Sequence, residues 1–246
     1  MRKSQKSVVA VVGLLAATVL FNQECQSQAP AAAPAAAPAA GGASGIKGKA
    51  AFTGTAPVMP KLKREADPFC GKTPMNDQEV VVNSNGTLKN VVIRVVKGAA
   101  PAAVPAASIE IDQSNCMYAP RVIAGMTGQK LIIKNGDPLM HNVHAYAGTA
   151  TTFNRAQMKG SKDIEQVIAA GVTKFKCDVH PWMTGYAVGN DNPYICVTGD
   201  TGECSIAGVP NGTYTVEAWH EKYGTKTVDV TVNNGVINAD FTFAAQ

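Results

Sequence analysis

Three residues with metal-binding side chains, Cys177, His180 and Met183, stand three positions apart in this sequence. A thiolate, an imidazole and a thioether in so short a stretch favour copper or zinc, because soft sulfur and imidazole suit these metals. One weak methionine ligand beside two histidines and a cysteine is typical of an electron-transfer copper site. The segment lacks the second histidine, and His141 and His144 are the upstream candidates. The spacing therefore predicts a mononuclear copper site.

The elements around these residues are predicted to be strands. Residues 172–177 alternate between apolar and polar side chains, so that Phe175 and Cys177 share one face and Cys177 is expected to point into a core. Residues 143–146 are also predicted as a strand. Side chains at positions i and i+3 of an extended chain point to opposite faces, so His141 and His144 cannot both reach one metal.

The rest of the sequence predicts an all-β protein. Short β-rich runs alternate with turn signals such as Asn85-Gly86 and Asn233-Asn234-Gly235, and no convincing long helix is found. Strands spaced in this way are typical of a β-sandwich. The predicted strands are residues 47–52, 80–82, 88–96, 130–135, 143–146, 172–177, 203–206, 213–219, 227–232 and 237–243.

The N-terminal segment indicates export. Residues 1–24 combine a basic start with an apolar run of signal-peptide length, and residues 25–45 form an Ala/Pro-rich linker. We expect a periplasmic or cell-envelope protein. Two interpretations of Cys25 stay open: it is lipidated and tethers the protein to a membrane, or cleavage further along removes it with the signal peptide.

The other cysteines suggest disulfides, because an oxidising compartment pairs cysteines that have no other task. Cys196 and Cys204 flank a Gly- and Asp-containing turn, which predicts a bridge across a hairpin. Cys70 and Cys116 are then left for each other. The lysines are scattered, so the sequence lacks the concentrated basic face of a nucleic-acid-binding protein.

The ligand order, a histidine after a tight turn and then Cys-x-x-His-x-x-Met, resembles the cupredoxins, the type 1 blue copper proteins. The spacings, together with the run from Met140 to His144, are most similar to the amicyanin- and plastocyanin-like members over residues 106–189. The resemblance implies a Greek-key β-sandwich, here at residues 106–192. It also implies one type 1 copper ion bound by four residues, namely His141, Cys177, His180 and Met183. His144 then faces outward.

The resemblance further implies a role in single-electron transfer between redox partner proteins, and not an enzyme. Asn142 matches a residue that ties the two ligand-bearing segments together. His180 is expected at the surface edge, where electrons would cross, with Pro181 and Trp182 forming an apolar docking rim.

Other metal chemistries fit the sequence less well. Zinc accepts the same cysteine and histidines, but the thioether argues against it. A binuclear copper centre needs a second cysteine in the loop, and a multicopper oxidase needs more than the 4 histidines present. A non-redox protein of the cell envelope, serving adhesion or envelope binding with structural copper, is the alternative function.

A second part of the chain resembles the transthyretin-like, or carboxypeptidase regulatory-like, β-sandwich. The resemblance rests on Gly212-Thr213-Tyr214 and covers residues 193–243, while the two opening strands of that family match residues near 45–48 and 88–92. This suggests one sandwich made of residues 46–99 with 193–246, into which the copper domain is inserted. A serial arrangement of the two domains stays open. His220 and Glu221 are interpreted as an exposed strand end or loop.

Overall fold

The computed structural model describes residues 44–245. The predicted signal peptide, Cys25 and all but the last two residues of the predicted linker lie outside these residues. No helix within the described part of the chain is both long and apolar enough to cross a membrane.

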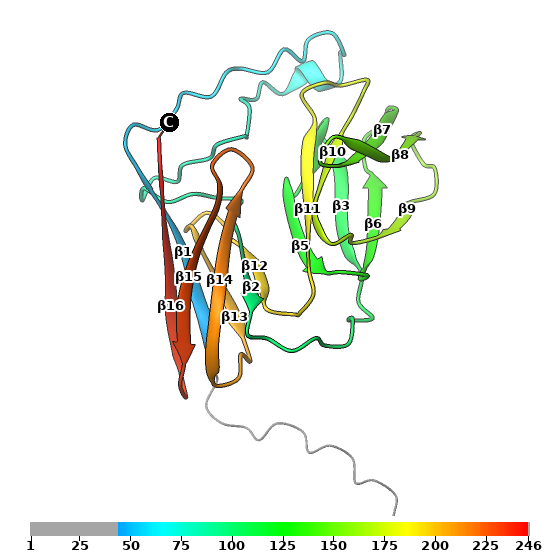
Figure 1. Ribbon diagram of the computed structural model, residues 1–246. Helices are drawn as coiled ribbons and strands as arrows, with labels where there is room; N and C mark the ends of the chain where they lie inside the picture. The colour runs from blue at the N-terminus through cyan, green and yellow to red at the C-terminus, as the bar shows by residue number, and fades with distance from the viewer. Residues whose placement is uncertain (1–43, 246) are drawn as a thin grey trace, which may run out of the picture. The chain divides into compact units, whose positions relative to one another are not determined.

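The strands of the described residues form four sheets (Figure 1). Two of them, with the orders β13-β1-β16 and β12-β2-β14-β15, enclose one apolar core, and we call this pair the terminal sandwich. Its strands come from both ends of the described chain: β1 (Gly45–Thr53), β2 (Val92–Lys97), β12 (Ile195–Val197), β13 (Glu203–Ala207), β14 (Gly212–His220), β15 (Gly224–Val232) and β16 (Val236–Ala244).

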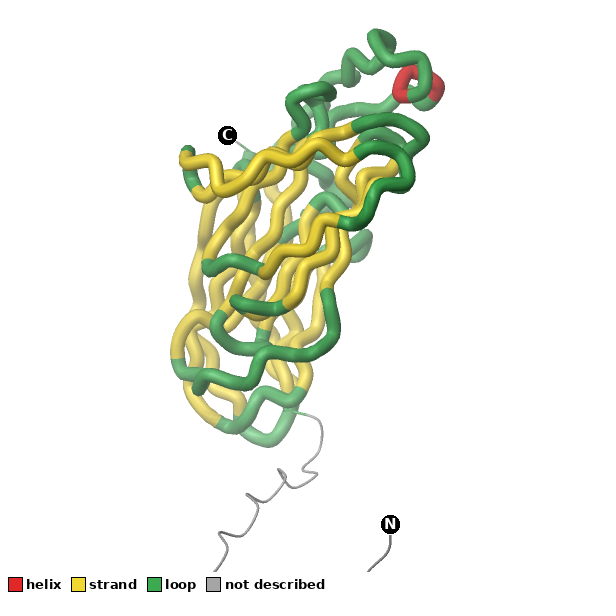
Figure 2. The backbone as a smooth tube through the Cα atoms, turned by 90° about the vertical axis from the view of Figure 1, so that its right-hand side faces the viewer, coloured by secondary structure: helices red, strands yellow, loops and turns green. Residues whose placement is uncertain are grey.

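The other two sheets, β5-β11-β10-β7-β8 and β4-β3-β6-β9, enclose a second core, and we call them the central sandwich. Figure 2 shows how strands dominate the described chain, with one short 3-10 helix, η1 (Cys70–Lys72), in a long loop. The strands are β3 (Ile109–Ser114), β4 (Met117–Ala119), β5 (Val122–Met126), β6 (Lys130–Asn135), β7 (His141–Ala147), β8 (Ala150–Gln157), β9 (Ile164–Val167), β10 (Gly171–Lys176) and β11 (Thr184–Asn190).

The all-β prediction is confirmed, and β6 spans the residues predicted for it. The strand predicted at residues 80–82 is wrong. Only an isolated bridge joins Val82 to Leu88 there. Val80 contributes its side chain to the terminal core, whereas its backbone belongs to the long loop between β1 and β2. Apolar residues can therefore be buried in this protein without joining a sheet.

The two sandwiches meet through a third apolar cluster and a buried ion pair. Val92 and Trp219 of the terminal sandwich pack there with Val122, Tyr186 and Val188 of the central sandwich. A contact of this kind holds the sandwiches together by removing apolar surface from water.

The ion pair corrects one sequence-based interpretation. Glu221 is buried and receives two bonds from Arg121 of the central sandwich, of 2.5 and 2.8 Å. The neighbouring His220 is 1% exposed. His220 does end β14, but the predicted exposure of these residues is wrong, because Arg121 of the central sandwich covers Glu221, and Tyr223 and Phe243 of the terminal sandwich lie against the His220 ring.

Both predicted disulfides are confirmed. Cys70 is bonded to Cys116, and Cys196 to Cys204. The second bridge does not close a hairpin, however, because Cys196 lies in β12 and Cys204 in β13, which belong to different sheets. Among the described cysteines, Cys177 alone is free.

Candidate metal centre

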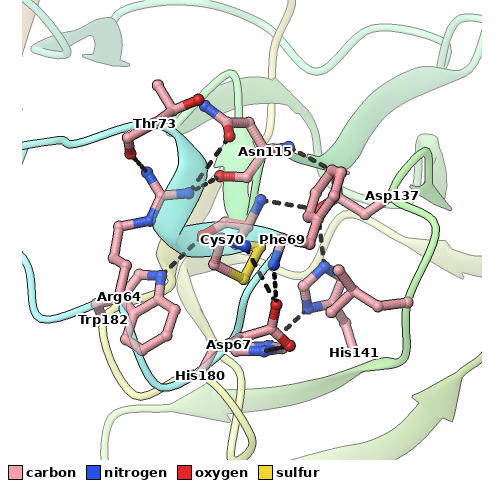
Figure 3. Close-up of a disulfide and its surroundings, with 12 residues drawn as sticks. Arg64, Asp67, Phe69, Cys70, Thr73, Asn115, Asp137, His141, His180 and Trp182 are labelled. Atoms are coloured by element: carbon pink, nitrogen blue, oxygen red, sulfur yellow. Dashed lines mark hydrogen bonds and ion pairs between the residues drawn. A yellow bond between two sulfur atoms is a disulfide. The ribbon is translucent and has the colours of Figure 1, made fainter.

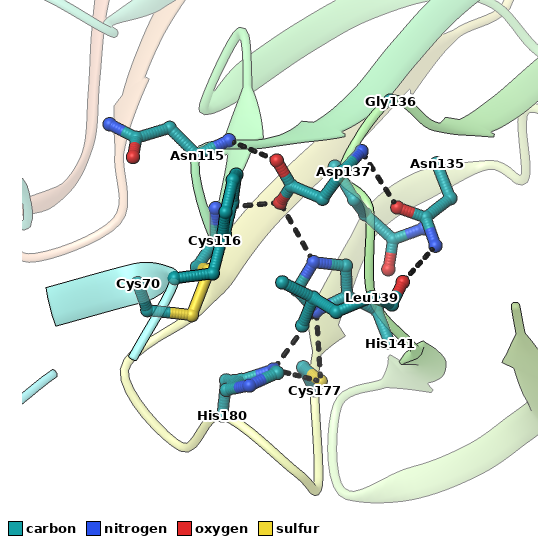
Figure 4. A network of polar contacts seen from close by, with 12 residues as sticks. Cys70, Asn115, Cys116, Asn135, Gly136, Asp137, Leu139, His141, Cys177 and His180 are labelled. Carbon is teal, nitrogen blue, oxygen red and sulfur yellow. Dashed lines mark hydrogen bonds and ion pairs between the residues drawn. A yellow bond between two sulfur atoms is a disulfide. The ribbon is translucent and has the colours of Figure 1, made fainter. Parts of the chain in front are cut away.

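The structure brings three of the four predicted ligands together at one end of the central sandwich. His141 begins β7, Cys177 directly follows the neighbouring strand β10, and His180 lies in the loop between β10 and β11. The Nδ1 atoms of the two histidines are 2.9 Å apart. The Cys177 Sγ atom is 4.0 Å from Nδ1 of His141 and 3.7 Å from Nδ1 of His180. Figure 4 shows the three side chains converging.

The fourth predicted ligand, Met183, is fully buried and belongs to the same apolar core as Cys177. Its backbone N–H donates a 2.9 Å hydrogen bond to the carbonyl of His180, which turns the chain back toward the core. Cys177 is 1% exposed, so the predicted inward orientation of its side chain is confirmed.

The converging atoms fit a metal ion. Two ligand atoms bound about 2.0–2.3 Å from one ion at trigonal or tetrahedral angles lie about 3.3–3.8 Å apart. Of the observed separations, 3.7 Å lies in that range and 4.0 Å lies just above it, whereas the 2.9 Å between the two Nδ1 atoms is a hydrogen-bond distance that would lengthen around a metal. Cys70 and Cys116 also lie close to the histidines, but their sulfurs form a disulfide and offer no thiolate. One thiolate and two imidazoles therefore define the centre.

Asp137 holds the outer side of His141. Its Oδ2 accepts a 2.8 Å hydrogen bond from Nε2 of His141, so the opposite ring nitrogen, Nδ1, faces Cys177. The carboxylate also accepts 2.7 Å bonds from the backbone N–H groups of Asn115 and Cys116. Both of these residues have positive φ, 53° and 54°, in the tight turn between β3 and β4. That turn aims two N–H groups at one carboxylate.

These contacts set the charges of the metal-free centre. Burial works against protonation of His141, but Asp137 and Cys177 outweigh it and raise the pKa of His141 to about 9. Burial also raises the pKa of Cys177, yet His141 and three backbone N–H groups lower it below its ordinary value. The pKa of His180 is lowered, first by burial and then by the charge on His141. Cys177 and His141 thus favour each other's charged forms, whereas the surroundings of His180 favour its neutral form.

The hydrogen-bond network assigns the protons accordingly. A doubly protonated His141 donates from Nε2 to Asp137 and from Nδ1 to Nδ1 of His180. His180 then keeps its own proton on Nε2 and presents a lone pair to the centre. The Nδ1 proton of His141 therefore occupies the place of a metal, and metal binding must release it.

Asn142 connects the two ligand-bearing segments, as the resemblance implied. Its side-chain oxygen accepts a 2.7 Å bond from the backbone N–H of Asp178 and lies 3.4 Å from Sγ of Cys177. His144 lies outside the cluster. Its ring bonds Asp178 at 2.9 Å and Thr151 at 2.9 Å, on the other face of β7.

The predicted exposure of His180 is wrong. His180 is 3% exposed, although Asp178, Val179 and Pro181 around it are exposed. A loop between β1 and β2, residues 61–76, lies over it, and we call this loop the cover. Figure 3 shows Asp67 of the cover facing His180. The predicted apolar docking rim of Pro181 and Trp182 also differs from the structure. Trp182 is half-buried and donates a hydrogen bond from Nε1 to the carbonyl of Cys116 at 3.0 Å.

Sequence reasoning missed Asp137 and the cover as parts of the site. Asp137 had a usable signal, since it lies in the predicted turn four residues before His141. The cover had one partial signal, the predicted Cys70–Cys116 disulfide, which joins it to the copper domain, but nothing in the sequence indicates that Asp67 lies beside His180.

Comparison with known proteins gives likenesses of fold only. No family model matches the sequence, and no curated protein matches it. A purple cupredoxin from Nitrosopumilus maritimus is 22% identical, with 33% of this chain and 98% of that chain covered and a TM-score of 0.30. Amicyanin from Paracoccus versutus is 22% identical, with coverage of 40% and 97% and a TM-score of 0.31. Each likeness concerns less than half of the chain.

Proposed function

We propose that the chain is an exported type 1 copper protein that carries single electrons between redox partner proteins and is not an enzyme. One observation carries this proposal: the buried thiolate of Cys177 and the Nδ1 atoms of His141 and His180 face one another within ligand distance. Copper, when bound, would supply reversible one-electron chemistry there. Cys177, His141 and His180 would be the strong ligands, and Met183 would be the weak one.

The residues around the ligands suit electron transfer better than catalysis. A catalytic metal site keeps one coordination position open to substrate. Here both histidines and the sulfur are almost fully buried, and Asp137 and Asn142 fix the ligand-bearing segments from outside. Ligands that are held in place need little rearrangement when the charge of the metal changes. The closed arrangement therefore supports a carrier.

We further propose that the central sandwich is a domain inserted into the terminal sandwich. Strand pairing supports this: β1 pairs with β13 and β16, and β2 pairs with β12 and β14. The two disulfides fit an oxidising compartment, which agrees with an exported protein.

Reconstitution with Cu(II) tests the proposed function. We expect an intense blue thiolate-to-copper absorption band and reversible reduction, both lost in Cys177→Ala. His144→Ala is the matched control, because His144 is near His141 in sequence but lies outside the cluster. A colourless copper complex, or a preference for zinc, would reject the carrier and favour a non-redox envelope protein with a structural metal.

A further inference from the structure

The cover is a compact loop whose two ends meet. Lys61 and Asn76 form a bridge, and the backbone N–H of Leu62 donates a 2.9 Å bond to the carbonyl of Met75. A loop of this length with joined ends is an Ω-loop, a type that often carries function. The cover belongs to the connection between two strands of the terminal sandwich, yet its residues Phe69 and Cys70 pack into the core of the central sandwich.

Two connections fasten the cover to the turn between β3 and β4. The disulfide joins Cys70 to Cys116, and the buried Arg64 donates hydrogen bonds to the carbonyls of Thr73 and Asn115. The same turn supplies the N–H groups that hold Asp137. The cover and the outer support of His141 are therefore parts of one connected frame.

Asp67 places a second carboxylate behind the metal centre. Its Oδ1 accepts hydrogen bonds from the backbone N–H groups of Phe69 (2.8 Å) and Cys70 (3.1 Å). Its Oδ2 lies 3.7 Å from Nε2 of His180, which is too long for a hydrogen bond but close enough for electrostatic attraction. Asp67 thus lies at the outer nitrogen of His180, as Asp137 lies at that of His141, although only Asp137 makes a hydrogen bond. The Cys70–Cys116 disulfide links the two backbone segments that hold the carboxylates.

The burial of His180 depends on this arrangement. Its neighbours in the loop are exposed, so the loop itself does not shield the ring. The ring packs between Trp182, with ring centroids 5.2 Å apart, and the cover. A carboxylate at the outer nitrogen favours a proton there and leaves Nδ1 free to bind a metal.

We propose that Asp67 is a positioning residue for His180 and that the disulfide-fastened cover shields the metal centre from water and external ligands. The inference rests on the proposed metal site. The cover, which belongs to the connection between β1 and β2 of the terminal sandwich, thereby takes part in the chemistry of the central sandwich.

Shielding is tested on the full, metal-free protein by the rate at which a maleimide labels Cys177. Peptide mass spectrometry distinguishes the label on Cys177 from the label on Cys25. We expect labelling about tenfold faster or more in the Cys70→Ser/Cys116→Ser double variant and in Asp67→Ala, because labelling follows the population of the open form. Asp163→Asn, an exposed change in the central sandwich, should match the wild type. Asp67→Ala keeps the disulfide and decides the result if the double variant does not fold.

Positioning is tested with Asp67→Asn in the copper-loaded protein. The amide oxygen can still accept the N–H groups of Phe69 and Cys70, so the change removes the charge with little change of shape. We expect copper affinity to fall about 10–100-fold, as for other outer partners of metal-bound histidines. The reduction potential should rise, because a negative charge near the metal favours Cu(II). A purely structural role would not move the potential.

The outcomes separate this inference from the proposed function. If labelling speeds up as expected but no blue copper band forms, the shielding stands while the carrier fails. If the band forms, but Asp67→Asn matches Asp163→Asn in affinity and potential, the positioning role is overturned. Slow labelling of Cys177 in Asp67→Ala and in any folded double variant would overturn the shielding.

Discussion

Asp137→Asn is the substitution that most directly tests how the metal centre is organised. In the native protein, Oδ1 of Asp137 accepts a hydrogen bond from the backbone N–H of Asn115. Oδ2 accepts bonds from the backbone N–H of Cys116 and from Nε2 of His141. An asparagine has one acceptor oxygen in place of two. If this oxygen keeps the bonds to Cys116 and His141, the amide N–H₂ faces the N–H of Asn115, and two donors then oppose each other in a buried place.

The magnitude follows from these contacts. Loss of one charge-assisted bond that leaves a buried donor unpaired costs about 1.5–3 kcal/mol of folding stability. Removing a carboxylate charge at hydrogen-bond distance also removes an effect of about 1–3 pH units on a neighbouring pKa. The pKa of His141, raised to about 9 in the native protein, should therefore fall clearly. Above pH 9, where His141 has released its proton in both proteins, copper affinity should drop by about 10–100-fold, the usual effect of losing an outer hydrogen-bond partner.

The assay is an NMR titration of the His141 ring in the metal-free protein, followed by copper competition measurements on the same samples. Asp163→Asn serves as the control, because it removes the same charge from an exposed position in the same sandwich. The reasoning is refuted if His141 still titrates near pH 9 in Asp137→Asn and copper affinity stays within about twofold of the control.

Three further outcomes are expected. Below pH 9, copper affinity should fall about tenfold per pH unit, since His141 must release a proton; competition titrations that show no slope would contradict this. Burial lowers the pKa of His220 from 6.5 to about 4, so its contribution of about 3 kcal/mol is present above pH 6.5 and is lost as the pH falls toward 4. Urea unfolding of His220→Gln, compared with the wild type, should show a smaller loss of stability over that range. Glu221→Gln, which leaves the buried Arg121 with only Asp77, 3.9 Å away, as a charged partner, should destabilise the protein by up to about 3–5 kcal/mol in urea, and a loss below about 1 kcal/mol would exclude a stabilising ion pair.

Local sequence patterns determined much of the site. The alternation of residues 172–177 fixes the direction of the Cys177 side chain, because successive side chains of a strand point to opposite faces. The same geometry separates His141 from His144. His180 lies only three residues beyond Cys177, so a short loop is enough to bring its ring back to the sulfur. The directions of these side chains and the closeness of Cys177 to His180 depend only on strand alternation and on spacing within a short segment.

Only the tertiary structure decided what surrounds the ligands. The environment of His180 is set by Asp67, which a loop of the other sandwich carries over the centre. Likewise, Glu221 is buried because Arg121 reaches it from the bend between β4 and β5. Such contacts join residues that are far apart in sequence and lie in irregular loops or at strand ends, where no periodicity indicates which face is covered. The sequence by itself therefore predicted which histidines and which cysteine converge at the candidate centre, while the packing of the two sandwiches determined that the centre is closed.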